Sequence, residues 1–553
     1  MSTSAIHDGM TDRQLSIDDN IAHSIDYDKG SYNNDVSTPT SINNDEHILS
    51  NGIVDRHDGE VLDNFDVELV GEAQQSYRVY WQRWLMLATF CALSCSNGMA
   101  WLTYASVSSY AVAYYNVSPL SINMMAVIYE VVYVACALFA GRITQKLGLR
   151  NGMWIGAALN AAGAIIRVLP WPFVDPRSVQ STSYGLAVFG QLCCGSAQLF
   201  TLATPVLIAE NWFPASERVT ATGLGALSNQ IGLVLAFATQ LIVLPTDYSY
   251  DPYEAPIQYY IITHGVIMLI ASLSVFLFFR AHPPTPPSPS ADKSSSAAEI
   301  AADEFDLLNV VGKCLVNWNL WLLLLAFGAA QGTSYAVATL IVSFMGDQNY
   351  TTQESNIAGL LLTVGGVISP LVFGFLADKT RRYKLLICIA MFSTTIFSIF
   401  MPLIDFLPHN TAIVQLFAFL LGFCIAAILP LALDVSVEVT YPLPPAVTST
   451  LCMIASNGAG VLLTFLIPQI QLMQSDLFAG WFVVVYMGVS SLLFLPFNAK
   501  SRRLELETET LIQRAAALST QRNRQLSLAK SGDLVMVEKN DSTQITESID
   551  KTL

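Results

Sequence analysis

The feature that most constrains this chain is a series of near-uniform apolar blocks between positions 84 and 497. Each block has about 20 residues, which as a helix is long enough to cross the hydrocarbon core of a bilayer. A soluble core cannot bury so many blocks of this kind. Only 13% of the residues are charged, whereas soluble proteins carry about 25%. The blocks therefore predict helices that have the bilayer as their solvent.

Twelve spans are expected, in two sets of six on either side of a polar, proline-rich segment that begins at His282. Such a segment is typical of a linker. The prediction is an all-α membrane protein with an N-terminal half at 81–280, a cytoplasmic linker at 281–317 and a C-terminal half at 318–498. The twelve expected spans are 84–106, 121–141, 151–171, 183–208, 219–243, 257–280, 318–345, 355–377, 384–404, 411–438, 446–469 and 479–497.

The net charge of −16 lies mostly in the two ends of the chain and does not indicate an acidic substrate site. An acidic, Asn- and Ser-rich segment cannot bury enough apolar surface to offset its ordering entropy. We therefore expect a disordered cytoplasmic tail at 1–80 and a second cytoplasmic tail at 499–553. No apolar stretch follows Met1 that would serve as a signal peptide, so the first span is expected to direct insertion.

Lysine and arginine gather after the even-numbered spans, which by the positive-inside rule places these loops and both termini in the cytoplasm. The residues are Arg142, Lys146, Arg150, Arg218, Arg280, Lys379, Arg381, Arg382, Lys384, Arg502 and Arg503, with Arg177 as the exception on the other side. The sequons at Asn116 and Asn349 then fall on the outer face and are candidate glycosylation sites.

An internal repeat relates the two halves. Gly141-Arg-Ile-Thr-Gln-Lys follows the second span, and Gly374-Phe-Leu-Ala-Asp-Lys-Thr-Arg381 follows the eighth. A loop that is merely basic would not recur in both halves. Both segments resemble the gating loop of the major facilitator superfamily, a twelve-helix fold of two six-helix halves. The resemblance implies that Gly141, Arg142, Gly374, Asp378 and Arg381 take part in gating, although the first copy has Gln145 where the aspartate is expected.

Polar residues inside spans are costly and usually face the interior of a helix bundle, so each is a functional candidate. Arg167, Glu210, Asp434 and Glu438 have alternative explanations, because they lie near span ends or near basic loops. Glu130 is close to mid-span, where a proton- or ion-coupled carboxylate and a buried ion pair are both open. The other candidates are Asn97, Asn160, Gln191, Gln198, Asn229, Gln230, Gln331 and Asn457.

Two aromatic residues occupy equivalent positions in the first span of each half. Trp101 follows Asn97 by one helical turn, and Tyr335 follows Gln331 by one turn. Small residues beside each ring, among them Gly98 and Gly332, would leave room for a ligand or kink the helix. Two electronegative ring faces across a cavity suit an organic cation. A single aromatic at such a depth would more readily be a packing residue, but the pairing favours a site.

Longer motifs resemble the feline leukaemia virus subgroup C receptor-related transporters over roughly residues 80–500. They include Cys95-Ser-Asn-Gly-Met-Ala-Trp101, Gly190-Gln-Leu-Cys-Cys-Gly-Ser-Ala-Gln198, Ser228-Asn-Gln-Ile-Gly232 and Val437-Glu-Val-Thr-Tyr-Pro442. The resemblance implies transport of choline or ethanolamine, with haem export also attributed to the family. It implies that Trp101, Tyr335, Gln198, Asn97 and Asn457 contact the substrate, although Asn457 stands where choline carriers of the family have glutamine.

The leading hypothesis is a carrier of a small organic cation that works by alternating access. A haem exporter is the alternative. It would need a larger cavity and histidine or tyrosine ligands. The membrane region offers His264 in a span and His409 in an outer loop, and no histidine pair lines the first and seventh spans, so haem export ranks lower. A non-transporting receptor or scaffold would not need polar groups in its spans. An enzyme is rejected, because no nucleophile–base pair or phosphate loop is present.

No partner beyond the substrate and the lipid bilayer is indicated. We expect a monomer that binds no nucleic acid, no cofactor and no metal, since none of the nine cysteines has metal-site spacing with histidine. Two cytoplasmic segments, at 303–308 and 507–512, resemble acidic dileucine sorting signals. Such signals are compatible with a location in the plasma membrane and with one in the vacuolar or lysosomal membrane.

Overall fold

The computed structural model describes residues 78–169, 180–202, 204–214, 217–244, 256–287, 307–348, 350–380, 382–404, 410–440 and 445–497. All of them belong to one compact unit, Ser76–Leu553. Apart from residues 78–80, the two expected tails lie outside the described residues, as does the middle of the expected linker. The tail predictions therefore stay predictions.

The first expected span is broken into three helices at the level of the aromatic candidate. α3 ends at Trp101, and Leu102 and Val107 leave the helical conformation, with φ/ψ of −92°/8° and −114°/28°. The helices of the N-terminal half are α3 (Gln82–Trp101), α4 (Thr103–Ser106), α5 (Ser108–Tyr115), α6 (Pro119–Leu147), α7 (Leu149–Val168), α8 (Gln180–Thr201), α9 (Thr204–Trp212), α10 (Arg218–Val243) and α11 (Pro256–Phe278).

The C-terminal half begins with a short helix inside the expected linker, α13 (Leu307–Leu315). The tenth expected span is divided between two helices, as the fourth is between α8 and α9. The remaining helices are α14 (Trp318–Asp347), α15 (Thr352–Thr380), α16 (Tyr383–Ser398), α17 (Phe400–Leu403), α18 (Thr411–Ala426), α19 (Ile428–Thr440), α20 (Pro445–Met473) and α21 (Asp476–Phe494).

Within the described ranges, nine helical segments are long and apolar enough to cross a membrane, and α8 with α9 make a tenth if this pair, bent by 41°, is one span. The expected spans 84–106 and 151–171 correspond to α3–α5 and α7. α3 and α7 are long enough to be counted, but their mean hydropathy is too low because they carry polar side chains such as Asn97, Asn160 and Arg167.

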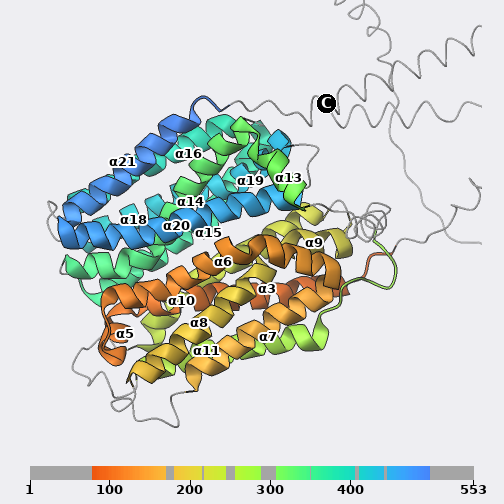
Figure 1. The fold of residues 1–553 in the computed structure, drawn as a ribbon, viewed down its shortest axis with the longest axis horizontal. Coiled ribbons are helices and arrows are strands. Elements are labelled where there is room, and N and C mark those ends of the chain that lie inside the picture. Colours follow the sequence, from red (N-terminus) through yellow and green to blue (C-terminus); the bar gives the residue numbers. More distant parts are fainter. Residues whose placement is uncertain are drawn as a thin grey trace, which may run out of the picture. The chain divides into compact units, whose positions relative to one another are not determined.

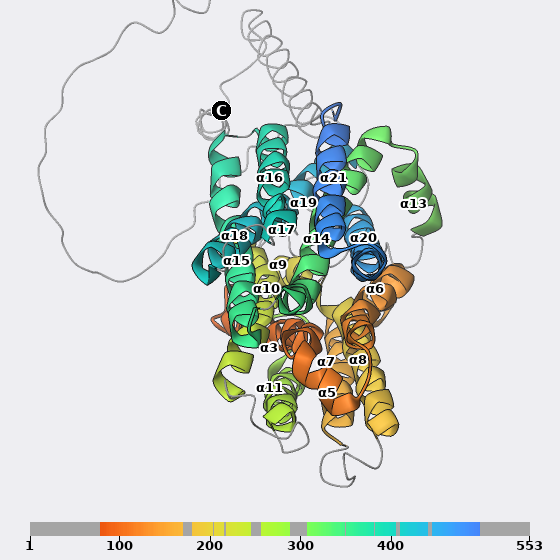
Figure 2. The ribbon, with the colours of Figure 1, turned by 90° about the vertical axis from the view of Figure 1, so that its left-hand side faces the viewer.

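The two halves repeat the same packing (Figure 1). α3 lies along α10 in the N-terminal half, and the equivalent pair α14 and α20 lie together in the C-terminal half. Figure 2 shows the orange and yellow helices of the first half grouped apart from the blue and green helices of the second. The halves meet mainly where α10 packs on α15 and α6 packs on α20.

The basic segments after the second and eighth spans are helical rather than looped. α6 continues to Leu147 and α15 to Thr380, so Gly141 and Gly374 lie within helices. The chain turns at Gly148, whose φ of 82° is a conformation that glycine adopts without steric cost. The helical hydrogen bonding thus continues through both basic segments, which the basic residues alone did not indicate.

Candidate substrate site between the two halves

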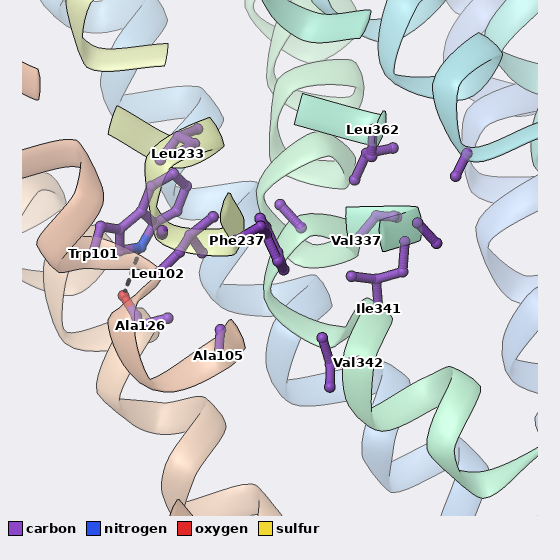
Figure 3. Close-up of a cluster of buried hydrophobic side chains, with 14 of the residues drawn as sticks. Trp101, Leu102, Ala105, Ala126, Leu233, Phe237, Val337, Ile341, Val342 and Leu362 are labelled. Carbon is purple, nitrogen blue, oxygen red and sulfur yellow. Dashed lines mark hydrogen bonds between the residues drawn. The ribbon is translucent and has the colours of Figure 1, made fainter. Parts of the chain in front are cut away.

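The two halves share one hydrophobic core at their junction. This shared core contains Trp101, Leu233 and Phe237 from the first half together with Val337 and Leu362 from the second. Figure 3 shows the side chain of Phe237 between Leu102 and the residues of α14. Toward the ends of the helices expected in the cytoplasm, each half has a separate core of its own.

Close contacts reinforce the junction at the end expected to face outward. The hydroxyl oxygens of Ser108 on α5 and Ser343 on α14 are 3.5 Å apart. On α15, Gly359 faces the ring of Phe237, and a Cβ at this glycine would lie 2.5 Å from a ring carbon. These contacts join the described helices of the two halves on the outer side.

Trp101 and Tyr335 meet directly at this junction. Their ring centroids are 5.0 Å apart and the ring planes are at 89°. Trp101 is 4% exposed and Tyr335 is partly buried beside the shared core. Perpendicular rings present two faces at one corner, which is the geometry in which aromatic side chains bind a quaternary ammonium group.

Backbone and side-chain contacts hold each ring in place. The indole nitrogen of Trp101 donates a hydrogen bond to the carbonyl of Ala126 on α6, at 3.1 Å (Figure 3). The hydroxyl of Tyr335 interacts with the side chains of Gln331 on α14 and Ser456 on α20. Two helices besides those that carry the rings, α6 and α20, thus hold the pair in place.

Two expectations about this pair differ from the structure. The rings were expected to face each other across a cavity, but they are in contact. Gly98 and Gly332 were expected to leave room for a ligand, and neighbouring helices fill that space instead. A Cβ at Gly332 would lie 2.5 Å from that of Ala459, and Gly98 lies against the carbonyl of Asn229. Small residues here serve close helix packing, the usual role of glycine in membrane bundles.

Among the predicted polar contacts, Gln198 and Asn457 are both buried. Gln198 on α8 is 7% exposed, and its amide oxygen has no hydrogen-bond partner in the described part of the chain. Asn457 follows Ser456 on α20 and donates to the carbonyl of Met453 in its own helix, at 2.7 Å. The amide oxygen of Gln331 also lacks a partner there. Two buried amide oxygens are therefore free to accept a hydrogen bond from a ligand.

Asn97 lies in a polar network inside the N-terminal half. Its amide nitrogen donates to the side-chain oxygen of Asn160 on α7, at 3.2 Å, and to the carbonyl of Cys194 on α8, at 2.9 Å. Asn160 in turn donates to the hydroxyls of Ser96 and Ser272. These bonds tie α3, α7, α8 and α11 together. The pairing of Asn97 with Asn160 was not foreseen, because their separation of 63 positions gives no local signal.

Both ring nitrogens of His264 are engaged. Nδ1 lies 2.9 Å from the hydroxyl of Thr103 and Nε2 lies 2.7 Å from that of Thr239. The side chain is fully buried. A histidine bonded at both nitrogens and closed to solvent has no free lone pair for haem iron. The other histidine considered, His409, lies outside the described residues.

Arg167 is a charged group buried in the first half. Its guanidinium donates to the side-chain oxygen of Gln191, at 2.9 Å, and contacts the sulfur of Met268. Although it lies near a span end, its side chain does not reach the surface, since only 3% of the residue is exposed. Its polar neighbours belong to α8 and α11, so it joins helices of one half.

The gating residues and the sequons are described only in part. Arg142 is exposed, and a Cβ placed on Gly141 or Gly374 would meet no other atom within 4 Å. The side chain of Asp378, like the whole of Arg381 and of Asn349, lies outside the described residues. Asn116 is exposed at the end of α5 in a left-handed conformation. No cluster of metal-binding side chains occurs within the described ranges.

A pocket beside the shared core is lined by apolar side chains of α14–α18, among them Val337, Ile341, Leu362, Phe400 and Leu421. It offers no polar group to orient a small charged solute. The aromatic corner, with the free amide oxygen of Gln331 one helical turn from Tyr335, is therefore the better candidate for a substrate site.

The model for the "Major Facilitator Superfamily" matches residues 89–449. The chain belongs to the major facilitator superfamily. It is a membrane transporter and not an enzyme. In fold, this transporter is similar to a D-xylose–proton symporter, with a TM-score of 0.58, 14% identity and coverage of 76% of this chain and 99% of the other. A bacterial homologue of the human lysosomal transporter Spinster gives a TM-score of 0.53 at 13% identity, covering 75% and 97%.

Curated relatives match most of the transporter. "Solute carrier family 49 member A3" of Danio rerio is 28% identical, covering 79% of this chain and 92% of the relative. "Choline/ethanolamine transporter FLVCR2" of Homo sapiens is 27% identical, covering 78% and 80%. "Choline/ethanolamine transporter FLVCR1" of Mus terricolor is 28% identical, covering 77% of each. These matches confirm the resemblance drawn from the motifs.

Proposed function

We propose that this transporter carries a small organic cation of the choline or ethanolamine class across the membrane by alternating access. The observation that supports it most is the perpendicular contact of Trp101 with Tyr335, which joins the first helices of the two halves. A cation over a desolvated aromatic face gains about 2 kcal/mol. The similar proteins named choline/ethanolamine transporters support the same substrate class.

The cation would bind in the corner between the ring faces, while its hydroxyl or amine group bonds an unsatisfied amide oxygen. Gln198 and Gln331 supply such oxygens. In the described arrangement the rings touch, so substrate must separate them. Opening of the outer side would also break the contacts of Ser108 with Ser343 and of Gly359 with Phe237. Binding at the aromatic corner would in this way be linked to the rocking of the halves.

Radiolabelled choline uptake in cells that express the full chain tests this proposal. Trp101→Ala should abolish most of the uptake above vector background. Trp154→Ala is the matched control, because Trp154 lies on α7 against Phe276, away from the junction, and this variant should keep normal uptake. Absence of choline and ethanolamine uptake by the wild type, or equal uptake by Trp101→Ala, would overturn the proposal.

Haem export lacks support from the described residues, because His264 is engaged at both nitrogens. We further propose that the transporter acts as a monomer, since both halves of the site come from one chain, and that it needs no nucleic acid. It is a multi-pass membrane protein. We propose the plasma membrane or the vacuolar or lysosomal membrane as its location, which imaging of a tagged full chain would distinguish.

A further inference from the structure

Glu130 is a buried carboxylate at the interface of the two halves. It lies on α6, and only 1% of the residue is exposed. Neither carboxylate oxygen has a hydrogen-bond partner in the described part of the chain. The group faces Gly460 on α20, where an added Cβ would lie 2.8 Å from Oε2 and 3.1 Å from Oε1. A side chain at 460 would therefore force the carboxylate to move.

The carboxylate is next to the aromatic corner. Ala126, whose carbonyl accepts the hydrogen bond of Trp101, precedes Glu130 by one helical turn, so both lie on one face of α6. Glu130 is also close enough to act electrostatically on Tyr335. The carboxylate and both rings therefore surround one region of the junction.

No described basic side chain compensates the carboxylate. Arg167 on α7 acts instead on Tyr104, Tyr129 and Cys194. Three further basic side chains lie on α6 and α7, and none is near Glu130. Arg142 and Lys146 come 12 and 16 residues later on α6, about 18 Å or more along its axis, and Arg150 at the start of α7 lies over the ring of Trp154.

The other described titratable side chains on α6 and on the helices that pack against it are tyrosines and cysteines, which offer no positive charge: Tyr335 on α14, Tyr184, Cys193 and Cys194 on α8, Cys452 on α20, Tyr104 on α4, Tyr110, Tyr114 and Tyr115 on α5, and Tyr129, Tyr133 and Cys136 on α6. The side chain of Asp347, at the end of α14, lies outside the described residues.

An ionised carboxylate that is buried without a partner is so costly that the group takes up a proton instead. The same carboxylate is stable in its ionised form once a cation lies beside it. A neutral carboxylic acid in the empty site and an ion pair in the occupied site are therefore the two favoured states.

We propose that Glu130 is the counter-charge of the transported cation, and that the transporter exchanges one organic cation for one proton. This inference rests on the proposed function. On one side of the membrane, the protonated carboxyl group and the free cation give the ion pair and a released proton. On the other side, proton uptake by the carboxylate releases the cation. Charge balances in each step, and one full cycle moves no net charge.

The purified full chain in proteoliposomes provides the test. With the membrane potential clamped by potassium and valinomycin, an acidic lumen should raise initial choline uptake several-fold over uptake at equal pH. Glu130→Gln should keep choline counterflow but lose this response. Glu130→Asp keeps a carboxylate and should therefore keep the response to the pH gradient. Glu438→Gln, which removes a half-buried carboxylate of α19, should respond as wild type does.

A second measurement detects the proton itself. Choline added to the wild type in weakly buffered detergent solution should release about one proton for each cation bound, and Glu130→Gln should release none. The uncharged analogue 3,3-dimethylbutan-1-ol should compete with choline about tenfold better in Glu130→Gln than in wild type, because a neutral site loses its charge preference.

The outcomes separate this inference from the proposed function. Choline counterflow by the wild type with no response to the pH gradient would overturn the exchange and leave the cation transporter intact. A full response in Glu130→Gln would assign the proton to another group and overturn the role of Glu130. Absence of choline and ethanolamine counterflow in the wild type would overturn both.

Discussion

Trp101 on α3 and Tyr335 on α14 are in edge-to-face contact, with ring centroids 5.0 Å apart and ring planes at 89°. The two helices are equivalent members of the two halves. Their contact therefore connects the halves through the groups best suited to hold an organic cation. A ligand that separates the rings acts on the substrate site and on the junction at once.

The ring of Tyr335, rather than its hydroxyl, should determine cation affinity. Tyr335→Ala is expected to raise the KM for choline about tenfold, equivalent to about 1.4 kcal/mol of lost cation–π attraction. Tyr335→Phe keeps the ring face, so its KM for choline should stay within about threefold of the wild-type value. A threefold change in KM corresponds to only about 0.6 kcal/mol of binding free energy. Initial rates over a range of choline concentrations measure both. Equal impairment of the two variants would instead assign the effect to the hydroxyl and its contact with Ser456.

A disulfide across the outer junction should stop transport. The hydroxyl oxygens of Ser108 and Ser343 are 3.5 Å apart, so cysteines at both positions come within reach of a bond. Oxidised Ser108→Cys/Ser343→Cys is expected to lose more than about 90% of uptake, since every cycle must separate these helices. Reductant should restore it. The single variants under the same oxidant are the controls for the native cysteines, and full activity of the cross-linked protein would show that these two helices need not separate during transport.

Close packing at Gly332 should make this position intolerant of a methyl group. Gly332→Ala puts a Cβ 2.5 Å from that of Ala459 and 2.8 Å from the backbone nitrogen of Gly460. The overlap should cost about 1–3 kcal/mol of stability and lower the midpoint of thermal unfolding in detergent. Gly346→Ala on the same helix is the matched control, because nothing lies within 4 Å of its Cβ. Similar midpoints for the two variants would show that α14 and α20 are not closely packed here.

Asn160 should matter for stability and not for substrate affinity. Asn160→Ala removes its bonds with Asn97, Ser96 and Ser272, at an expected cost of about 1–2 kcal/mol, given about 0.6 kcal/mol for a typical hydrogen bond between membrane helices. The choline KM of the folded fraction should be unchanged. Asn151→Ala, which removes an exposed asparagine of the same helix, should leave the thermal midpoint as in wild type.

The same pair of measurements tests the predicted contact of Asn97 with substrate. Asn97→Ala should lower the thermal midpoint as Asn160→Ala does, because both asparagines belong to one network. A raised KM at an unchanged midpoint would show instead that Asn97 reaches the substrate. The free amide oxygen of Asn97 is the atom that would then be involved.

Residue periodicity and composition were enough to predict the helical spans, because an apolar run of the right length has few other stable conformations in a bilayer. The equivalent positions of Trp101 and Tyr335 were also visible, since the repeat aligns the first spans of the two halves. The break of the first span after Trp101 had no such signal. It depends on the packing of α4 against α6 and α14, which the local sequence does not record.

The sequence by itself determined that this protein is a two-half membrane transporter with paired aromatic residues, because hydropathy, charge asymmetry and the repeated motif are local properties of the chain. Only the tertiary structure decided which polar residues serve packing and which remain unpaired. Asn97 finds partners on distant helices, whereas Glu130 lies against a glycine and has none among the described residues. Burial and pairing are set by contacts between segments far apart in sequence, so the contact of Trp101 with Tyr335 and the burial of Glu130 against α20 arise only when the halves pack together.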